Sequence, residues 1–458
     1  MQISPMVREC CHKQLQKENE PMSKKPRVKL WIILPVLLLA AIGLYLLPPI
    51  QQRVNWRLAS LQTQIFYWLN PPDQVSLAQE EQIDVIVKAT WSAITRQQTE
   101  QAVLPTITPP VVVETQIITP TPTIEPTPAP TATPLPSKVV LSGIQHEYQS
   151  FNNCGPVNLS MALGFWGWQG NQNMTKQVLR PNEDDSNVMV EEMANYVTQQ
   201  TGLQALVRYG GSQQLLKDLI AAGFPVIIES GHQPPKDWWM GHYVVVSGYD
   251  DSWSTFITQD SLIMPDLPLP YEEMAKHGWR DFNYVYLVIY PASEEEKIIS
   301  LLGADYDPLE NLNRSLQNTE AEIPQLAERD LFFAWFNHGA LLQKMGDAQA
   351  AAASFDLAFA QYDTLTEDQR PWRVLWYRVE PYQAYYETGR YQSVIDLANA
   401  TLSMLSKRGL EETHFWRGLA YEALGQNEKA IFDYEIALQL RPTYAEAQQA
   451  LLRVQGMP

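Results

Sequence analysis

The chain has 458 residues, of which 45% are hydrophobic and 18% charged, a composition typical of folded globular domains. This length accommodates two or three domains. The formal net charge of -18 excludes a general nucleic-acid binder, because that role requires a basic surface.

The N-terminus carries the features of a membrane anchor. Residues 1–29 form a basic tail with seven Lys or Arg against three Glu, and the uncharged run LWIILPVLLLAAIGLYLL follows. Residues 30–50 are therefore predicted to be a single transmembrane helix, with a cytoplasmic N-terminus and the remaining domains extracytoplasmic at the cell membrane. A cleaved signal peptide is the alternative, although no small-residue cleavage site follows Leu47. Translation starts at Met1 or at Met22, which begins MSKKP.

Two segments separate the anchor from the folded domains. Residues 51–104 are predicted to be a membrane-proximal helical segment to which we assign no function. Residues 105–137 are rich in Pro and Thr, which favours an extended polyproline-type stalk. Such a stalk would hold the following domains away from the bilayer, and plain disorder predicts nearly the same behaviour.

Residues 138–292 are predicted to form an α+β domain, with helices first and strands after them. The helical part comprises a run from Val157, a segment that begins at a Ser186 cap and stops at Gly202, and a short helix from Gly211. LQALVRY is also strand-like, and the runs that follow the helices are rich in β-branched and aromatic residues and bounded by turn residues: PVIIES, HYVVVSGY, STFITQD and FNYVYLVIY.

A connector, residues 293–328, leads to repeats in residues 329–458. Two segments align on each other, and their matching positions are Gly339, Gly346, Ala351, Phe355 and Ala358 with Gly418, Gly425, Ala430, Tyr434 and Ala437. A degenerate copy between them has Tyr382 in place of the first Gly. The pattern resembles the tetratricopeptide repeat, which implies an all-α solenoid of helix pairs that binds a protein partner. Generic helical hairpins are the alternative.

One cysteine lies beyond the basic tail. Cys154 stands in the motif NNCGP, before an apolar helical run, and Cys10 and Cys11 belong to the tail, so the outer part holds no internal disulfide. Because Pro is favoured in the first turn of a helix, Cys154 is expected at a helix N-terminus. That position lowers the pKa of a thiol and favours the nucleophilic thiolate. A small buried hydrophobic residue is the alternative.

A nucleophilic cysteine needs a histidine as its base. We select His242, which opens the strand GHYVVVSGYD and would be held rigidly at a cleft edge. Asp260 ends the next strand, so a hairpin turn at YDDSWS would let it accept the imidazole N–H. A structural histidine and a turn cap are the alternatives for these two residues. His232 is the second choice of base, and the remaining candidates are His146 and His277.

The motifs NNCGP, GHYVVVSGYD and QDS together resemble cysteine peptidase family 39, the papain-like bacteriocin-processing endopeptidases, and more closely their stand-alone relatives. The resemblance covers about residues 140–290, roughly a third of the chain. It implies a papain-like fold in which Cys154 is the nucleophile, His242 the general base and Asp260 the group that orients the histidine. The bacteriocin-processing members are fused to transporter domains, and none is found here, so their substrate is not implied.

One position departs from the family. Its members use a Gln six residues before the cysteine as an oxyanion-hole donor, and that position is Tyr148 here. We assign the role to Gln149, five residues before Cys154, with Gln145 as the alternative. A misplaced donor would give a weak enzyme, since losing one typically costs about 10²–10³ in rate.

These features predict a membrane-anchored, extracytoplasmic cysteine endopeptidase-like hydrolase that acts on a protein or peptide. The repeats would recruit a protein partner. The sequence has no metal or nucleotide motif, so we expect no metal and no cofactor. Trp238 and Trp239 are expected to line or cover the cleft, or else to pack in the core. Two other hypotheses are an inactive peptide-binding module and a related acyl transfer, such as cell-wall amide hydrolysis or transglutamination.

Overall fold

The computed structural model describes residues 134–233, 238–405 and 409–456, together with Leu39, Gly43 and Tyr45, which are helical. The chain divides into two units, Met1–Val54 and Asn55–Pro458, and the elements below lie in the second. Within the described ranges no helix combines the length and apolar character needed to cross a membrane. The predicted tail, spanning helix, membrane-proximal segment and stalk lie almost entirely outside the described residues.

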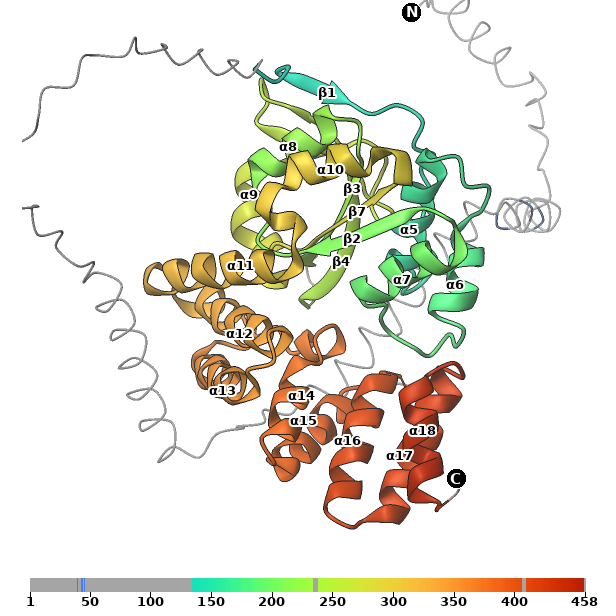
Figure 1. Cartoon of the computed structure of the whole chain (residues 1–458), viewed down its shortest axis with the longest axis vertical. Coiled ribbons are helices and arrows are strands. Elements are labelled where there is room, and N and C mark those ends of the chain that lie inside the picture. Colours follow the sequence, from blue (N-terminus) through green and yellow to red (C-terminus); the bar gives the residue numbers. More distant parts are fainter. Residues whose placement is uncertain are drawn as a thin grey trace, which may run out of the picture. The chain divides into compact units, whose positions relative to one another are not determined.

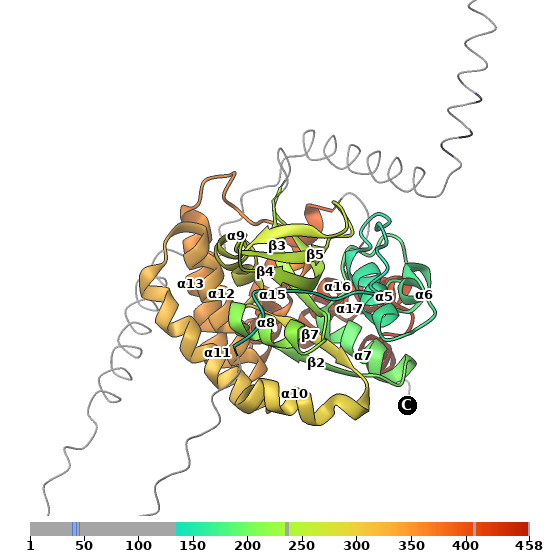
Figure 2. The same ribbon diagram turned by 90° about the horizontal axis from the view of Figure 1, so that it is seen from above.

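An antiparallel sheet is the centre of the first folded region (Figures 1 and 2). The described strands are β1 (Lys138–Val140), β2 (Gln204–Arg208), β3 (Val226–His232), β4 (Met240–Asp250), β5 (Thr255–Gln259), β6 (Leu267–Pro270) and β7 (Tyr286–Tyr290). They form one seven-stranded sheet in the order β2-β7-β3-β4-β5-β6, and β1 pairs with the end of β4. The predicted hairpin is formed by β4 and β5, with Asp250 opposite Thr255. We call residues 138–292 the sheet domain.

Both faces of this sheet are covered, because successive strand residues point alternately into two cores. Its helices are α5 (Cys154–Phe165), α6 (Gln172–Leu179), α7 (Val190–Gln200), α8 (Gln213–Ala221) and α9 (Tyr271–His277), with a 3₁₀ turn η1 (Trp279–Phe282). Ile227 and Val245 face the core that contains α5 and α7. Ile228 and Val246 face the core that contains α8 and α10 (Glu295–Leu302). The sheet therefore holds α5 and the ends of β4 and β5 in one rigid frame.

The predicted start of α7 was wrong. The helix begins at Val190, and Ser186 lies in the preceding loop. Val188 is buried, and its carbonyl accepts a hydrogen bond from the Tyr243 hydroxyl at 3.0 Å, so packing onto β4 keeps this stretch out of the helix. The predicted stop is confirmed, because the helix ends at Gln200 and Gly202 has a positive φ of 73°.

The rest of the described chain is helical. After two 3₁₀ turns, η2 (Ala292–Glu294) and η3 (Gly303–Tyr306), and the intervening α10, it contains α11 (Pro308–Glu322), η4 (Ile323–Gln325), α12 (Glu328–Lys344), α13 (Ala348–Thr364), η5 (Val374–Trp376), α14 (Glu380–Glu387), α15 (Tyr391–Ser403), α16 (Glu411–Ala423), α17 (Asn427–Leu440) and α18 (Ala445–Val454). The pairs α12–α13, α14–α15 and α16–α17 correspond to the three predicted units (Figure 1). The mixed α and β region followed by a helical repeat region was thus predicted correctly.

Small residues explain how closely the paired helices approach. A Cβ added at Gly339 would lie 2.9 Å from the Phe355 ring, and one added at Gly418 would lie 2.7 Å from the Tyr434 ring. The middle unit has no such glycine, and its Tyr382 is fully buried with its hydroxyl 2.8 Å from the Thr401 hydroxyl. The first and last helix pairs therefore leave no room for a side chain at Gly339 and Gly418, whereas the middle pair packs around Tyr382.

The repeat region shares a core with the sheet domain. Trp239, just before β4, stacks on Phe282 at 5.8 Å between ring centroids and lies 5.3 Å from the Phe333 ring of α12. The Asn337 side chain, also on α12, donates a hydrogen bond to the Arg280 carbonyl at 2.6 Å. The two regions therefore form a continuous packed structure over these contacts.

Candidate active site

Cys154 is the first residue of α5. Gly155 and Pro156 complete the first turn, and the apolar residues that follow are buried against the sheet. A Cβ on Gly155 would lie 3.2 Å from Val188, so a glycine lets the start of this helix lie close to the segment before α7. The thiol is half-buried at the positive end of the helix dipole, which favours its ionised form.

The structure brings His242 and Asp260 to this helix terminus. His242 lies near the start of β4, and Asp260 directly follows β5, the neighbouring strand. The imidazole Nε2 is 3.1 Å from the Asp260 carboxylate, and Cys154 forms a hydrogen bond with the same imidazole. Because Nε2 faces Asp260, Nδ1 is the nitrogen left for the thiol. The loop after β5 holds the carboxylate in place, since the backbone N–H groups of Leu262 and Ile263 donate to it at 2.8 and 3.0 Å.

The three groups shift one another's pKa values toward an ion pair. Burial alone would raise the pKa of the Cys154 thiol, but the hydrogen bond and charge of His242, with the backbone N–H groups of Tyr243 and Gly155, lower it below its ordinary value. Burial opposes protonation of His242, yet Asp260 and Cys154 raise its pKa to about 10. Burial is likewise outweighed at Asp260, whose pKa His242 lowers to about 2. The arrangement favours a thiolate beside an imidazolium at neutral pH.

Gln149 lies beside the same cluster. Its side-chain oxygen accepts a hydrogen bond from the Ser261 hydroxyl at 2.8 Å, and its backbone N–H donates to the Ser261 carbonyl at 3.0 Å. Ser261 follows Asp260, so the loop that orients His242 also holds Gln149. The Gln149 amide nitrogen has no partner among the described residues, which leaves a donor for a ligand. Tyr148 packs its ring on His146 at 4.7 Å, and Gln145 is exposed.

The other sequence candidates lie elsewhere or play a different part. The His232 ring centroid is 5.7 Å from that of His242, so His232 is a neighbour of the cluster. Trp239 is buried in the core, and its indole N–H donates to the Asp281 carboxylate at 2.7 Å. Trp238 packs edge-on against Trp372 at 6.3 Å. Of the two roles expected for these tryptophans, Trp239 therefore has the packing one.

Asn158 is a site residue that the motifs did not reveal. It is fully buried one turn after Cys154, and its amide nitrogen lies 2.9 Å from the Cys154 carbonyl, 2.7 Å from the Tyr243 carbonyl and 3.3 Å from the Ser261 hydroxyl. One side chain thus ties the helix to the strand that carries His242 and to the loop that carries Asp260. The signal in the sequence was a single Asn within an apolar helical run, where a polar residue requires buried partners.

Arg180 is a second residue of this kind. Its guanidinium is buried and donates to the carbonyls of Phe151 and Asn152, in the loop just before Cys154. Burial lowers the pKa of Arg180, while the negative charges of Asp185 and Cys154 oppose that shift. The cation therefore both holds the loop and adds positive potential near the thiol.

Three carboxylates lie close enough together to suggest a metal site. Oxygens of Glu192, Glu411 and Glu412 are within 4.8 Å of one another. The Arg441 guanidinium contacts carboxyl oxygens of all three, so a cation already lies in the cluster. Burial raises the pKa of Glu412 to about 8. We assign the cluster to the contact between α7 and the repeats.

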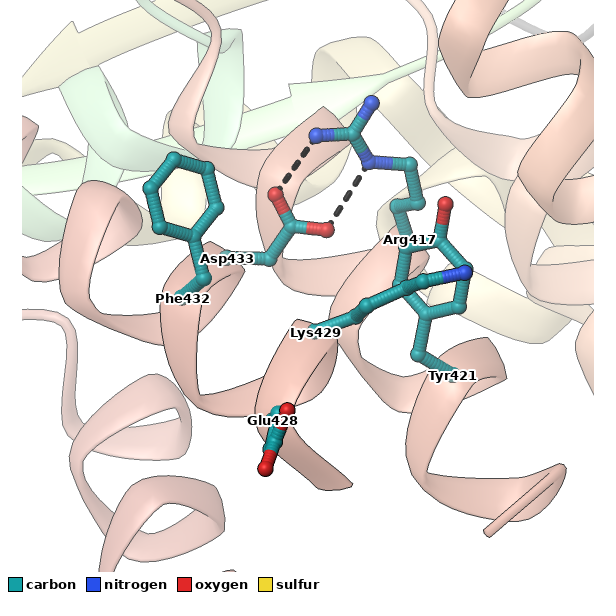
Figure 3. Close-up of a pocket in the computed structure, with 6 residues that line it drawn as sticks. All are labelled: Arg417, Tyr421, Glu428, Lys429, Phe432 and Asp433. Carbon is teal, nitrogen blue, oxygen red and sulfur yellow. Dashed lines mark hydrogen bonds and ion pairs between the residues drawn. The ribbon is translucent and has the colours of Figure 1, made fainter. Parts of the chain in front are cut away.

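A cavity of about 320 Å³ lies between α16 and α17. Its lining residues are Arg417, Tyr421, Glu428, Lys429, Phe432 and Asp433 (Figure 3). Arg417 donates to both oxygens of Asp433 at 2.8 and 2.7 Å, so this buried charge is already paired. The cavity contains none of the predicted site residues, and the reactive groups that could act together are those around Cys154.

Comparison with known proteins agrees with the division into a sheet domain and a repeat region. The model of the Peptidase C39-like family matches residues 141–286, and that of the tetratricopeptide repeat matches residues 411–444. Among solved structures, a C39-like peptidase from Bacillus anthracis is 18% identical over 33% of this chain and 96% of its own, with a TM-score of 0.29. The APC/C hetero-tetramer Cut9–Hcn1 is 22% identical over 33% of this chain and 28% of that chain, with a TM-score of 0.27. No curated protein matches. The predicted C39-like domain followed by a tetratricopeptide repeat is confirmed.

Proposed function

We propose that the C39-like domain is a cysteine peptidase of papain-like design that hydrolyses peptide bonds. The observation that carries this proposal is the placement of Cys154 at the start of α5, in hydrogen-bond contact with an imidazole that Asp260 holds from its other side. A thiol in this setting is nucleophilic at neutral pH because its thiolate is stabilised.

The geometry supports the following reaction. The Cys154 thiolate attacks the peptide carbonyl, and the resulting oxyanion accepts hydrogen bonds from the Gln149 amide and the Cys154 backbone N–H. The His242 imidazolium gives its proton to the leaving amine as the C–N bond breaks, which leaves an acyl-enzyme. His242 then takes a proton from water, whose oxygen attacks the acyl carbonyl, and the thiolate leaves. Asp260 keeps the imidazole in the orientation that both steps require.

We further propose that this domain works outside the cytoplasm, anchored through residues 30–50. The basic tail and the uncharged run that follows it support this orientation. The tetratricopeptide repeat supports a role in protein–protein interaction, so the helical region would bring a protein partner or substrate to the peptidase.

The test uses the full chain with Cys10 and Cys11 changed to Ser, so that Cys154 is the single thiol. Purified protein is incubated with a library of capped peptides at neutral pH, and new termini are read by mass spectrometry, with a Cys154→Ala variant as the matched control. Cleavage by the parent and none by the variant supports the proposal. Equal product from both proteins refutes it. Release of an amine and a carboxylate from added peptidoglycan, or of ammonia from a glutamine side chain when an amine is added, without peptide cleavage would replace it with the related acyl-transfer activity.

A further inference from the structure

A segment of the repeat region lies next to the candidate active site. Tyr377 directly follows η5 and is outside residues 141–286, which match the C39-like family. Its ring packs edge-to-face with the Trp239 ring, with 5.8 Å between the ring centroids, and in the same way with the Phe282 ring at 6.0 Å. Both of these residues belong to the sheet domain, so Tyr377 packs onto the start of the strand that carries His242.

Gly241, the residue before His242, makes room for this tyrosine. A Cβ on Gly241 would lie 2.8 Å from Tyr377 Cδ1 and 2.8 Å from the Phe282 ring, closer than such contacts allow. The Gly241 backbone N–H lies near the Tyr377 hydroxyl and lowers the pKa of that phenol. The motif glycine therefore admits a side chain that comes from more than 130 residues later in the chain.

The neighbouring residue anchors the segment. Arg378 is buried, and its guanidinium donates to the Asp281 carbonyl at 3.2 Å and to the Asn337 side-chain oxygen at 3.1 Å. Asn337 in turn donates to the Arg280 carbonyl at 2.6 Å. These bonds connect the segment after η5 to α12 in the repeat region and to η1 in the sheet domain. The position of Tyr377 is therefore fixed by contacts with both regions.

The Tyr377 hydroxyl keeps a proton that it can donate. Burial raises the pKa of this phenol, and negative charge on the nearby Cys154 raises it further, so it stays protonated. Among the described residues, no hydrogen bond donated by this hydroxyl is found. Tyr377, Cys154 and His232 are each half-buried, so each keeps part of its surface accessible to a ligand.

We propose that Tyr377 is a substrate-binding residue supplied by the repeat region, whose ring forms one wall of the cleft and whose hydroxyl donates to a backbone carbonyl of the bound peptide. This inference rests on the proposed peptidase function and adds to it. It means that the repeat region completes the active site, in addition to any partner that it recruits.

The test separates thiol reactivity from peptide binding. In the single-thiol full chain, Cys154 is alkylated by iodoacetamide, which needs only the thiolate, and by the capped tetrapeptidyl chloromethyl ketone that labels the parent fastest in a panel. Tyr377→Phe removes the hydroxyl and keeps the ring, and Tyr386→Phe on α14 is the matched control. For Tyr377→Phe we expect the peptide reagent's KI to rise about 3- to 10-fold, the loss of one hydrogen bond, with kinact and the iodoacetamide rate within about 2-fold of the parent.

Three outcomes would overturn the inference. An unchanged KI in Tyr377→Phe shows that the hydroxyl does not bind the peptide. An equal fall in the alkylation rates with the peptide reagent and with iodoacetamide shows that the substitution acts on the thiol through the structure. A parent that reacts with iodoacetamide but with no peptide in the panel has no peptide cleft for Tyr377 to line. By contrast, a parent that resists both reagents removes the proposed function itself, and with it this role for Tyr377.

Discussion

The His242→Ala substitution gives the sharpest test of the proposed chemistry. In the folded protein, burial raises the pKa of the Cys154 thiol and His242 more than offsets that effect. Without the imidazole, burial is opposed only by the helix terminus and the backbone N–H groups, so the pKa of Cys154 should rise. A thiol with a pKa of about 8.5 is roughly 3% ionised at pH 7, so a variant whose Cys154 returns to that ordinary pKa would hold about this fraction of thiolate. We therefore expect its alkylation at pH 7 to be slower than that of the parent, by up to about 30-fold for a parent thiol that is fully ionised at this pH.

The assay is the second-order rate of iodoacetamide alkylation from pH 5 to pH 10 in the single-thiol chain. The parent should reach its thiolate plateau below the ordinary thiol pKa, and its imidazolium should persist to about pH 10, the pKa of His242. The variant should approach the parent's rate only above pH 9. His232→Ala is the matched control, because the His232 ring lies beside that of His242, whereas Asp260 contacts the His242 imidazole. If His242→Ala shows the pH profile of the parent, the ion pair between Cys154 and His242 is refuted. If His232→Ala loses that profile, His232 is the histidine that lowers the pKa of the thiol, and His242 was the wrong choice.

Three further predictions concern stability. Asn158→Ala removes the side-chain donor of the Tyr243 carbonyl and the second donor of the Cys154 carbonyl, which keeps its helical backbone bond, so the free energy of unfolding should fall by about 1–3 kcal/mol in urea denaturation; a change below about 1 kcal/mol would mean that water replaces the side chain. Glu412, with its pKa raised to about 8, stays protonated in the folded state where the unfolded chain is ionised, so stability should decline as pH rises from about 5 to 8. Glu412→Gln should flatten that decline by up to about 1.4 kcal/mol per pH unit, and an identical slope would contradict the raised pKa. A chain ending at Leu302 exposes the Trp239 and Phe282 contacts, so it should aggregate; a soluble product alkylated at the parent's rate would show that the sheet domain folds alone.

Local sequence signals were sufficient for the elements that carry the predicted site. Gly-Pro after Cys154 favours a helix that begins at the cysteine, because a proline in the first turn loses no hydrogen bond. A short turn between two strongly β-forming runs makes β4 and β5 neighbours, which places Asp260 beside His242. The repeat glycines were visible for a similar reason, since each repeat reuses one close helix crossing.

Packing between distant segments decided the rest. The observed start of α7 differs from the predicted one because Val188 packs on the sheet. Trp239 is a core residue because Phe333 of a repeat helix covers it. The sequence by itself determined the order of the domains and the residue types available for chemistry, because helix caps, turns and period-two strands are encoded within a few residues. Only the tertiary structure decided that Asn158 ties the site together and that Tyr377 reaches it, because both depend on partners whose distance along the chain carries no periodic signal.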